Sequence, residues 1–102
     1  MIKYVALYRM PDDPAAFDRS YFETHVPIVD ETPGLVRTEI AKVTRMVVGE
    51  PAYYLMAELY FDSVESMKAA FKTDPWRKSG ENLQEWGGMD LVTMFTAEVV
   101  DG

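Results

Sequence analysis

The sequence predicts a single α+β domain whose strands and helices follow in the order β-α-β-β-α-β. Three observations support this order. Four segments are rich in β-branched and aromatic residues, as strands are, and most of them alternate in polarity. Phe17, Tyr21 and His25 recur at helical spacing between the first two segments. A second region with helical spacing, residues 62–86, separates the third segment from the fourth. Residues 1–102 have the length of one domain.

The first strand and the first helix are predicted from the N-terminal quarter of the chain. Residues 2–10 are bounded by a turn rich in proline and aspartate, and they predict a strand of about eight residues. Asp13 followed by Pro14 is typical of an N-cap and a first helical position. We expect the helix that begins there to continue to about Thr24.

A proline shortly after the only histidine predicts the end of this helix. Pro27 has no N–H to donate and disfavours helical geometry at Val26. We therefore expect the helix to end or kink at His25. Pro27 would then begin a second short helical turn through Asp30. The imidazole would lie at the break between two helical pieces.

The second and third strands are predicted to form a hairpin. Alternation over residues 35–48 predicts a long strand, with a bend or bulge near residues 42–45. The Gly-Glu-Pro-Ala segment at residues 49–52 turns the chain back. Residues 53–61 predict the third strand, with odd-numbered residues from Leu55 on one side and even-numbered residues from Tyr54 on the other.

The second helical region is predicted to start directly after the third strand. Asp62 and Glu65 have the spacing of a capping box, and this helix ends by Thr73. Asp74-Pro75 begins another short helical piece, which Gly87-Gly88 ends. Residues 91–100 then alternate and predict the fourth strand.

Elements in this order form a ferredoxin-like, four-stranded antiparallel sheet with both helical regions on one face. Three of the four strands are apolar or aromatic on both sides, which is unusual for a sheet with one face in water. A monomer would expose a large apolar patch. We therefore expect a homodimer in which two identical sheets pack face to face.

The composition argues against several classes of function. A net charge of −7 disfavours binding to nucleic acid and to anionic membrane surfaces. The chain has no cysteine, and its single histidine belongs to no cluster with metal-ligand spacing, so we expect no metal site. No apolar run spans a bilayer, and the first residues enter a strand directly, so we expect no signal peptide and a cytoplasmic location. Without a glycine-rich phosphate loop, we expect no cofactor.

One motif resembles a known family. Phe17, Tyr21 and His25-Val-Pro-Ile28, followed by Pro33-Gly34-Leu35 at the entry to the second strand, resemble the pattern of the EthD family. The resemblance covers nearly the whole chain and is least specific in its later half. It implies a dimeric α+β barrel. EthD proteins are associated with degradation of ethyl tert-butyl ether beside an oxygenase system. The wider superfamily includes cofactor-free monooxygenases, isomerases and cyclases.

His25 is the candidate catalytic residue. As a general acid or base it would border a pocket between the helices and the sheet, because its charge changes near neutral pH. The alternative is a structural imidazole that bonds the last carbonyls of the first helix.

Five further residues are candidates for binding a substrate. Glu58 is either a second acid or base or, as we favour, part of a buried ion pair with a Lys or Arg across the dimer. Asp90 either orients an imidazole or simply begins the last strand. The aromatic residues Tyr21, Trp76 and Trp86 suit the walls of an apolar pocket, and they equally suit the core.

Two functions are compatible with these residues. The first is a cofactor-free enzyme of the oxidative degradation of small apolar or aromatic compounds. His25 would move a proton in it, as in a monooxygenase-type, isomerase or cyclase reaction. The second is a non-catalytic, ligand-binding or stress-associated dimer in which His25 is only a cap.

Overall fold

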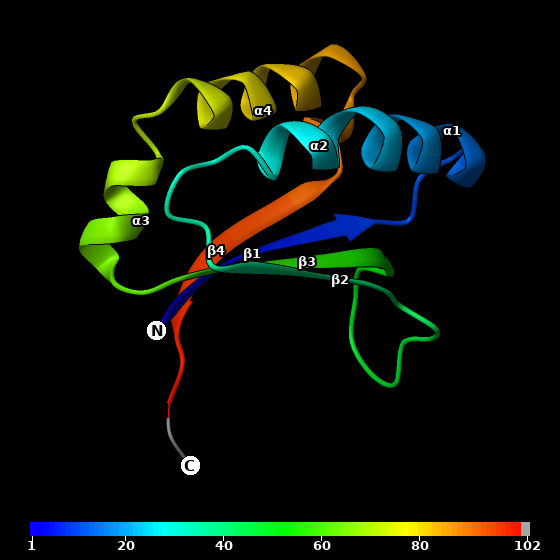
Figure 1. Cartoon of the computed structure of the whole chain (residues 1–102). Helices are drawn as coiled ribbons and strands as arrows, with labels where there is room; N and C mark the ends of the chain where they lie inside the picture. Colours follow the sequence, from blue (N-terminus) through cyan, green and yellow to red (C-terminus); the bar gives the residue numbers. More distant parts are fainter. Residues whose placement is uncertain (101–102) are drawn as a thin grey trace.

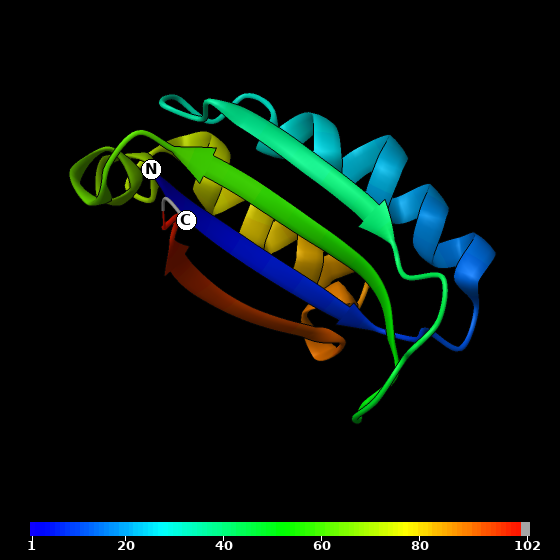
Figure 2. The same ribbon diagram turned by 90° about the horizontal axis from the view of Figure 1, so that it is seen from below.

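The helices lie on one side of a four-stranded antiparallel sheet (Figure 1). The computed structural model describes residues 1–100. The strands are β1 (Ile2–Arg9), β2 (Arg37–Lys42), β3 (Tyr53–Phe61) and β4 (Val92–Glu98). They lie in the order β2-β3-β1-β4, which Figure 2 shows from the side without helices. This order confirms the predicted ferredoxin-like fold and the predicted placement of the helices on one face.

Strand alternation gives the sheet two different faces. In the central pair, Tyr8 lies opposite Leu55 and Ala6 opposite Ala57, and these side chains face the helices. The intervening residues point the other way. We call that surface the open sheet face, and its central residues are Lys3, Val5, Leu7, Met56, Glu58, Tyr60 and Phe95.

The first helical region is one continuous run made of α1 (Pro14–Asp18), the π-helix η1 (Arg19–His25) and α2 (Val26–Val29). The N-cap prediction is confirmed, because the Asp13 carboxylate accepts a hydrogen bond from the backbone N–H of Ala16 at 3.1 Å. The capped helix carries its apolar residues toward the sheet, where Phe17 is buried.

The predicted break at His25 is wrong. His25 and Val26 both have helical dihedral angles, with φ −71° and ψ −50° for His25 and φ −57° and ψ −46° for Val26. The Val26 N–H bonds the carbonyl of Tyr21, five residues earlier, which is the spacing of a π-turn. A wider turn eases the clash of a proline ring with the carbonyl four residues before it. The helix therefore passes through Pro27, which lies in the first turn of α2.

The second helical region consists of α3 (Val64–Ala70), α4 (Asp74–Glu85) and the short 3₁₀ turn η2 (Gly88–Asp90). The cap of α3 is Ser63 and not Asp62, since the Ser63 hydroxyl accepts from the N–H of Ser66 at 3.1 Å. The piece after Asp74-Pro75 is not short, since α4 has 12 residues. Gly87 ends it with a φ of 87°, as the glycine pair predicted.

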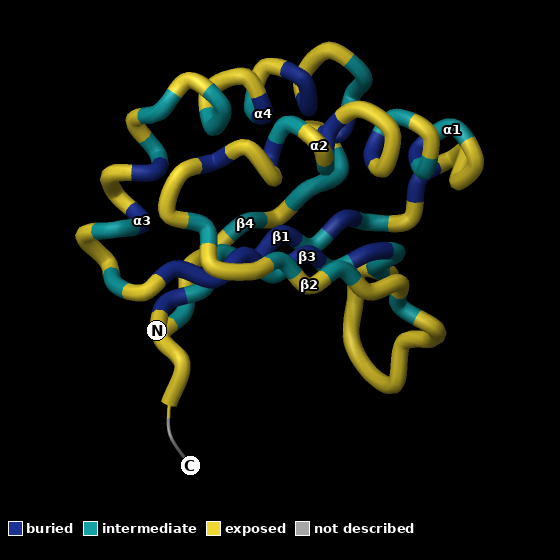
Figure 3. Tube along the Cα trace, viewed as in Figure 1, coloured by how far each residue is buried: buried dark blue, intermediate teal, exposed yellow. Residues whose placement is uncertain are grey.

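The second strand is shorter than predicted. β2 stops at Lys42, and one further bond joins the Val43 N–H to the Tyr54 carbonyl. β3 begins at Tyr53, so the alternating residues after Val43 have no strand to pair with. Residues 43–52 form a loop on the side away from the helices, where Val47 and Val48 are exposed (Figure 3).

The core lies between the sheet and the helices. Its largest fully buried side chains are Tyr8, Leu55 and Phe61. Burial of each such side chain contributes roughly 1.5–3 kcal/mol. The Tyr8 ring also meets Phe17 edge to face, with ring centroids 5.4 Å apart, so α1 and β1 are held together. No helix in the described part of the chain is long and apolar enough to cross a membrane.

Candidate functional site

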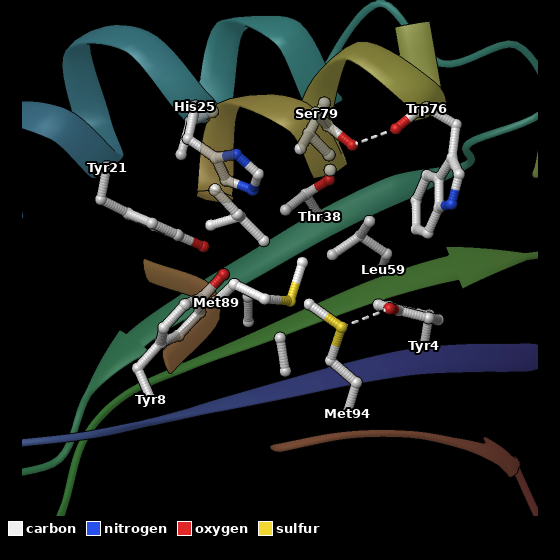
Figure 4. Close-up of a pocket in the computed structure, with 16 residues that line it drawn as sticks. Tyr4, Tyr8, Tyr21, His25, Thr38, Leu59, Trp76, Ser79, Met89 and Met94 are labelled. Carbon is white, nitrogen blue, oxygen red and sulfur yellow. Dashed lines mark hydrogen bonds between the residues drawn. The ribbon is translucent and has the colours of Figure 1, made fainter. Parts of the chain in front are cut away.

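A cavity of about 180 Å³ lies between the helices and the sheet (Figure 4). β1 and β3 form its floor, η1, α2 and α4 its walls, and Met89 of η2, at 37 % exposure, lies at its mouth. Most of its lining is aliphatic, aromatic or thioether. The polar residues that line it are Tyr4, Tyr8, Tyr21, His25, Thr38 and Ser79.

His25 borders this cavity and is almost fully buried, with 5 % of its surface exposed. The Tyr21 ring, one helical turn earlier, lies with its centroid 5.5 Å from that of the imidazole. The Nδ1 atom of His25 is buried and has no hydrogen-bond partner, and the same is true of the Thr38 hydroxyl. Buried polar atoms without a hydrogen-bond partner cost free energy, so both atoms are locally destabilising.

Burial also sets the charge of the imidazole. It lowers the pKa of His25 from 6.5 to about 4, and the nearby Asn82 side chain opposes this only in part. His25 is therefore neutral at pH 7, with one nitrogen that accepts a proton and one N–H that donates. A negative charge developing on a bound compound would favour its protonated form.

Trp76, one of the expected pocket residues, lies at the α4 wall of the cavity. Its ring meets Tyr4 edge to face at a centroid distance of 4.9 Å, and its backbone carbonyl accepts a hydrogen bond from the Ser79 hydroxyl at 2.6 Å. The Tyr4 hydroxyl in turn donates to Met94 Sδ at 2.6 Å. These contacts fix the aromatic end of the cavity before any ligand enters.

Glu58 does not line the cavity. It follows the even-numbered alternation of β3 and therefore lies on the open sheet face. Its carboxylate accepts from the Lys3 ammonium at 2.9 Å and from the Tyr60 hydroxyl at 3.0 Å. The ion pair is formed within one chain rather than across a dimer.

Trp86 and Asp90 also lie away from the cavity. The Trp86 ring stands edge to face with Phe17 at 5.3 Å, and its indole N–H donates to Asn82 Oδ1 at 3.0 Å. Asp90 is exposed in η2, and its backbone carbonyl accepts a hydrogen bond from the Arg9 guanidinium. Trp86 thus supports α1 and α4, and Asp90 precedes the last strand.

The cavity also contains residues that the sequence analysis did not single out. Tyr8 had a usable signal, because it shares the strand phase of Ala6, which is buried, and of Tyr4, which is half-buried. Thr38 can be assigned to the cavity lining only when the register of β2 against β3 is known. Met89 lies in a three-residue turn, for which no periodic signal exists.

No three His, Cys, Asp or Glu side chains within residues 1–100 lie close enough together to hold a metal ion. Among the described residues, no Asp, Glu, Lys or Arg lines the cavity. The cavity is therefore mostly apolar, with one imidazole and several hydroxyls on its walls.

The chain is an α+β domain of the ferredoxin-like class, with an apolar cavity under its helices. Within this class, residues 11–85 match the EthD domain, and the chain belongs to the EthD family. A relative from Rhodococcus erythropolis, described as an uncharacterized 11.0 kDa protein in the thcB-thcC intergenic region, is 30 % identical over 98 residues. That match covers 96 % of this chain and 95 % of the relative.

Solved structures show the same fold. The crystal structure of an ethyl tert-butyl ether D (EthD) family protein from Bacillus halodurans is 36 % identical, with a TM-score of 0.91. The match covers 98 % of this chain and 99 % of that chain. SnoaB, a cofactor-independent oxygenase from Streptomyces nogalater, shares the fold at 13 % identity and a TM-score of 0.65, over 99 % of this chain and 93 % of its own.

Proposed function

We propose that the protein is a cofactor-independent enzyme that moves a proton on a small, mostly apolar compound, with His25 as the proton acceptor and donor. The observation that carries this proposal is a buried, neutral His25 at the wall of an apolar cavity. Neutral imidazole is suited to accept a proton at pH 7.

The size and lining of the cavity limit the compound. An apolar cavity of roughly 150 Å³ accommodates benzene. The cavity here, at about 180 Å³, suits a single ring or a compact acyl body with a few further atoms. Its apolar walls exclude water from the reacting group, which strengthens every electrostatic interaction there.

Two reaction types use such a proton transfer. A deprotonated phenol-like compound reacts with dioxygen, and this is the route of a monooxygenase-type enzyme in oxidative degradation. Membership of the EthD family and the shared fold of a cofactor-independent oxygenase support that type. An isomerase or cyclase reaction needs only the proton shuttle and the shaped cavity.

A second candidate function is ligand binding without turnover. The observation that favours it is that no Asp, Glu, Lys or Arg side chain within residues 1–100 lines the cavity, so His25 has no charged acid or base of that part of the chain beside it. In that case the imidazole would only bond a polar group of the ligand.

The experiment that separates the two is a turnover assay with anthrones and lactones, following oxygen uptake and substrate absorbance. His25→Gln keeps a hydrogen-bonding side chain but cannot accept a proton at pH 7. We expect it to lower turnover about 100-fold or more while the compound still binds. Thr24→Ala, at the exposed neighbouring position of η1, is the matched control and should retain full turnover. Binding by the wild type without any turnover would support the second function.

We also propose that two copies pair through the open sheet face. Its aliphatic and aromatic residues include Val5, Leu7, Met56 and Phe95, and Phe95 is 46 % exposed. Loop 43–52 extends on the same side of the sheet, with exposed apolar residues at its tip (Figure 1). Light scattering should give twice the chain mass of 11.6 kDa, and Phe95→Glu should halve it. A wild-type monomer at micromolar concentration would refute the pairing.

A further inference from the structure

The hydroxyls of Tyr8 and Tyr21 meet at one side of the cavity. Tyr8 comes from β1 and Tyr21 from η1, and their ring centroids lie 5.3 Å apart with the ring planes at 70°. Both residues are nearly fully buried, at 1 % and 3 % exposure, and both line the cavity. Figure 4 shows the two hydroxyls directed toward the same region of the cavity, below His25.

Neither hydroxyl has a protein acceptor in the described part of the chain. Other tyrosines do: Tyr4 donates to Met94 Sδ, Tyr54 to Asp18, and Tyr60 to Glu58. Neither oxygen is among the inaccessible unpaired polar atoms of residues 1–100, so both hydroxyls are open to the cavity. An acceptor supplied by a ligand can reach both donors.

The kind of acceptor follows from the surroundings. Burial raises the pKa of both tyrosines above the ordinary value of 10, so both hydroxyls keep their protons and act as donors. No cationic side chain of the part of the chain that the structure describes lines the cavity, so these neutral donors are what stabilises negative charge there. Hydrogen bonds to a charged acceptor are about twice as strong as neutral ones, and preorganised donors in a dry site are most effective where charge develops.

We propose that the Tyr8 and Tyr21 hydroxyls together bind one ligand oxygen as an oxyanion, and that the ligand is a phenol or an enolisable carbonyl compound. This inference rests on the proposed function, because it assigns the ligand class of the same cavity. The O–H or C–H bond of the ligand breaks, and its proton passes to an imidazole nitrogen of His25. The electron pair stays on the ligand, as the phenolate or enolate oxygen between the two hydroxyls.

A carboxylic acid fits this cavity less well. Its anion is already formed in water and would lose its hydration on entering an apolar space. A phenol or a ketone enters neutral, and its charge appears only after the donors and the imidazole surround it. Tyr8 and Tyr21 therefore select compounds that ionise inside the cavity.

The test uses 4-nitrophenol, whose phenol and phenolate forms absorb differently, at a pH where most of the free probe is protonated. We expect the wild-type protein to increase the phenolate fraction of bound probe. Tyr8→Phe and Tyr21→Phe should each lower the bound phenolate-to-phenol ratio about tenfold or more. Tyr54→Phe is the matched control, because its hydroxyl bonds Asp18 outside the cavity, and its ratio should equal that of the wild type.

A second probe, 4-nitroanisole, has the same ring but cannot ionise. Unchanged binding of this probe to the Tyr→Phe variants would show that the cavity is intact. If the wild type binds both probes without phenolate enrichment, the oxyanion site is refuted while the cavity remains a ligand site. Enrichment that survives in the double variant and is lost in His25→Gln also refutes it, since the imidazole would then carry the effect. If neither probe binds, the inference and the proposed function both fail.

Discussion

The Lys3 ammonium and the Glu58 carboxylate lie 2.9 Å apart on the open sheet face, and the Tyr60 hydroxyl donates to the same carboxylate oxygen. The hydrogen bond from Lys3 holds the pKa of Glu58 below its usual 4.5. Because the folded-state pKa is lower than the unfolded one, the carboxylate stabilises the fold above pH 4.5. This stabilisation is lost as the pH falls through the folded-state pKa.

We therefore predict that Glu58→Gln lowers the melting temperature at pH 7, and that the difference from the wild type shrinks as the pH drops below 4.5. Calorimetry over this pH range measures both effects. Glu39→Gln on the same face is the control, because Glu39 forms only an exposed pair with Arg37 and should change the melting temperature little. Equal losses for the two variants would contradict the prediction.

His25 predicts a pH dependence of a different origin. Its folded-state pKa of about 4 lies below the usual 6.5, so the unfolded chain binds its proton first as the pH falls. The free energy of unfolding should fall between pH 6.5 and pH 4 by up to about 3 kcal/mol from this group. Urea unfolding of wild type and His25→Gln across this range isolates the effect, since the carboxylates are common to both. Parallel curves for the two proteins would show that His25 is not buried in its neutral form.

The start of α3 provides a prediction about the source of helix stability. Ser63→Ala removes the hydroxyl that accepts from the Ser66 N–H and should cost about 1 kcal/mol. Asp62→Ala, one residue earlier, should cost clearly less, because its side chain is not the cap. Urea unfolding of the two variants at pH 7 makes the comparison. A larger loss of unfolding free energy for Asp62→Ala than for Ser63→Ala would support the capping box expected from the sequence.

Met89 at the cavity mouth should control the entry of ligands. Met89→Trp places a bulkier and stiffer side chain there, and we expect the association rate of 4-nitroanisole to fall severalfold. Met10→Trp makes the same change at a position that is 52 % exposed and outside the cavity lining, and its rate should not change. Stopped-flow mixing measures both rates. An unchanged rate for Met89→Trp would place the entrance elsewhere.

The fold could be predicted from the sequence because the hydrophobic residues repeat clearly at strand or helix spacing, and the predicted elements are consistent with one fold. The third strand was predicted with its observed bounds, since every second residue from Leu55 to Phe61 is buried. Errors arose where two local preferences compete. Pro27 disfavours an α-helix, but a π-turn accommodates it, and no local rule predicts which outcome prevails.

The candidate site was predicted less completely, because it depends on which residues meet across the layers. His25, Tyr21 and Trp76 lie at one cavity since each is on the inner side of its helix. The even-numbered phase of Glu58 in β3 already indicated the opposite face. Tyr8 shares the phase of the buried residues, but only its position beside Tyr21 shows that its hydroxyl is available.

β1 has consequences for how this family can change in length. Its residues alternate between the cavity floor, with Tyr4 and Tyr8, and the open sheet face, with Val5 and Leu7. Loss or gain of one residue within Ile2–Arg9 would exchange the two sets and place the tyrosines on the wrong side. Gain or loss of residues in loop 43–52 would disturb neither surface of the sheet. Viable descendants of this chain should therefore vary in length at that loop, while the residue count of β1 stays fixed.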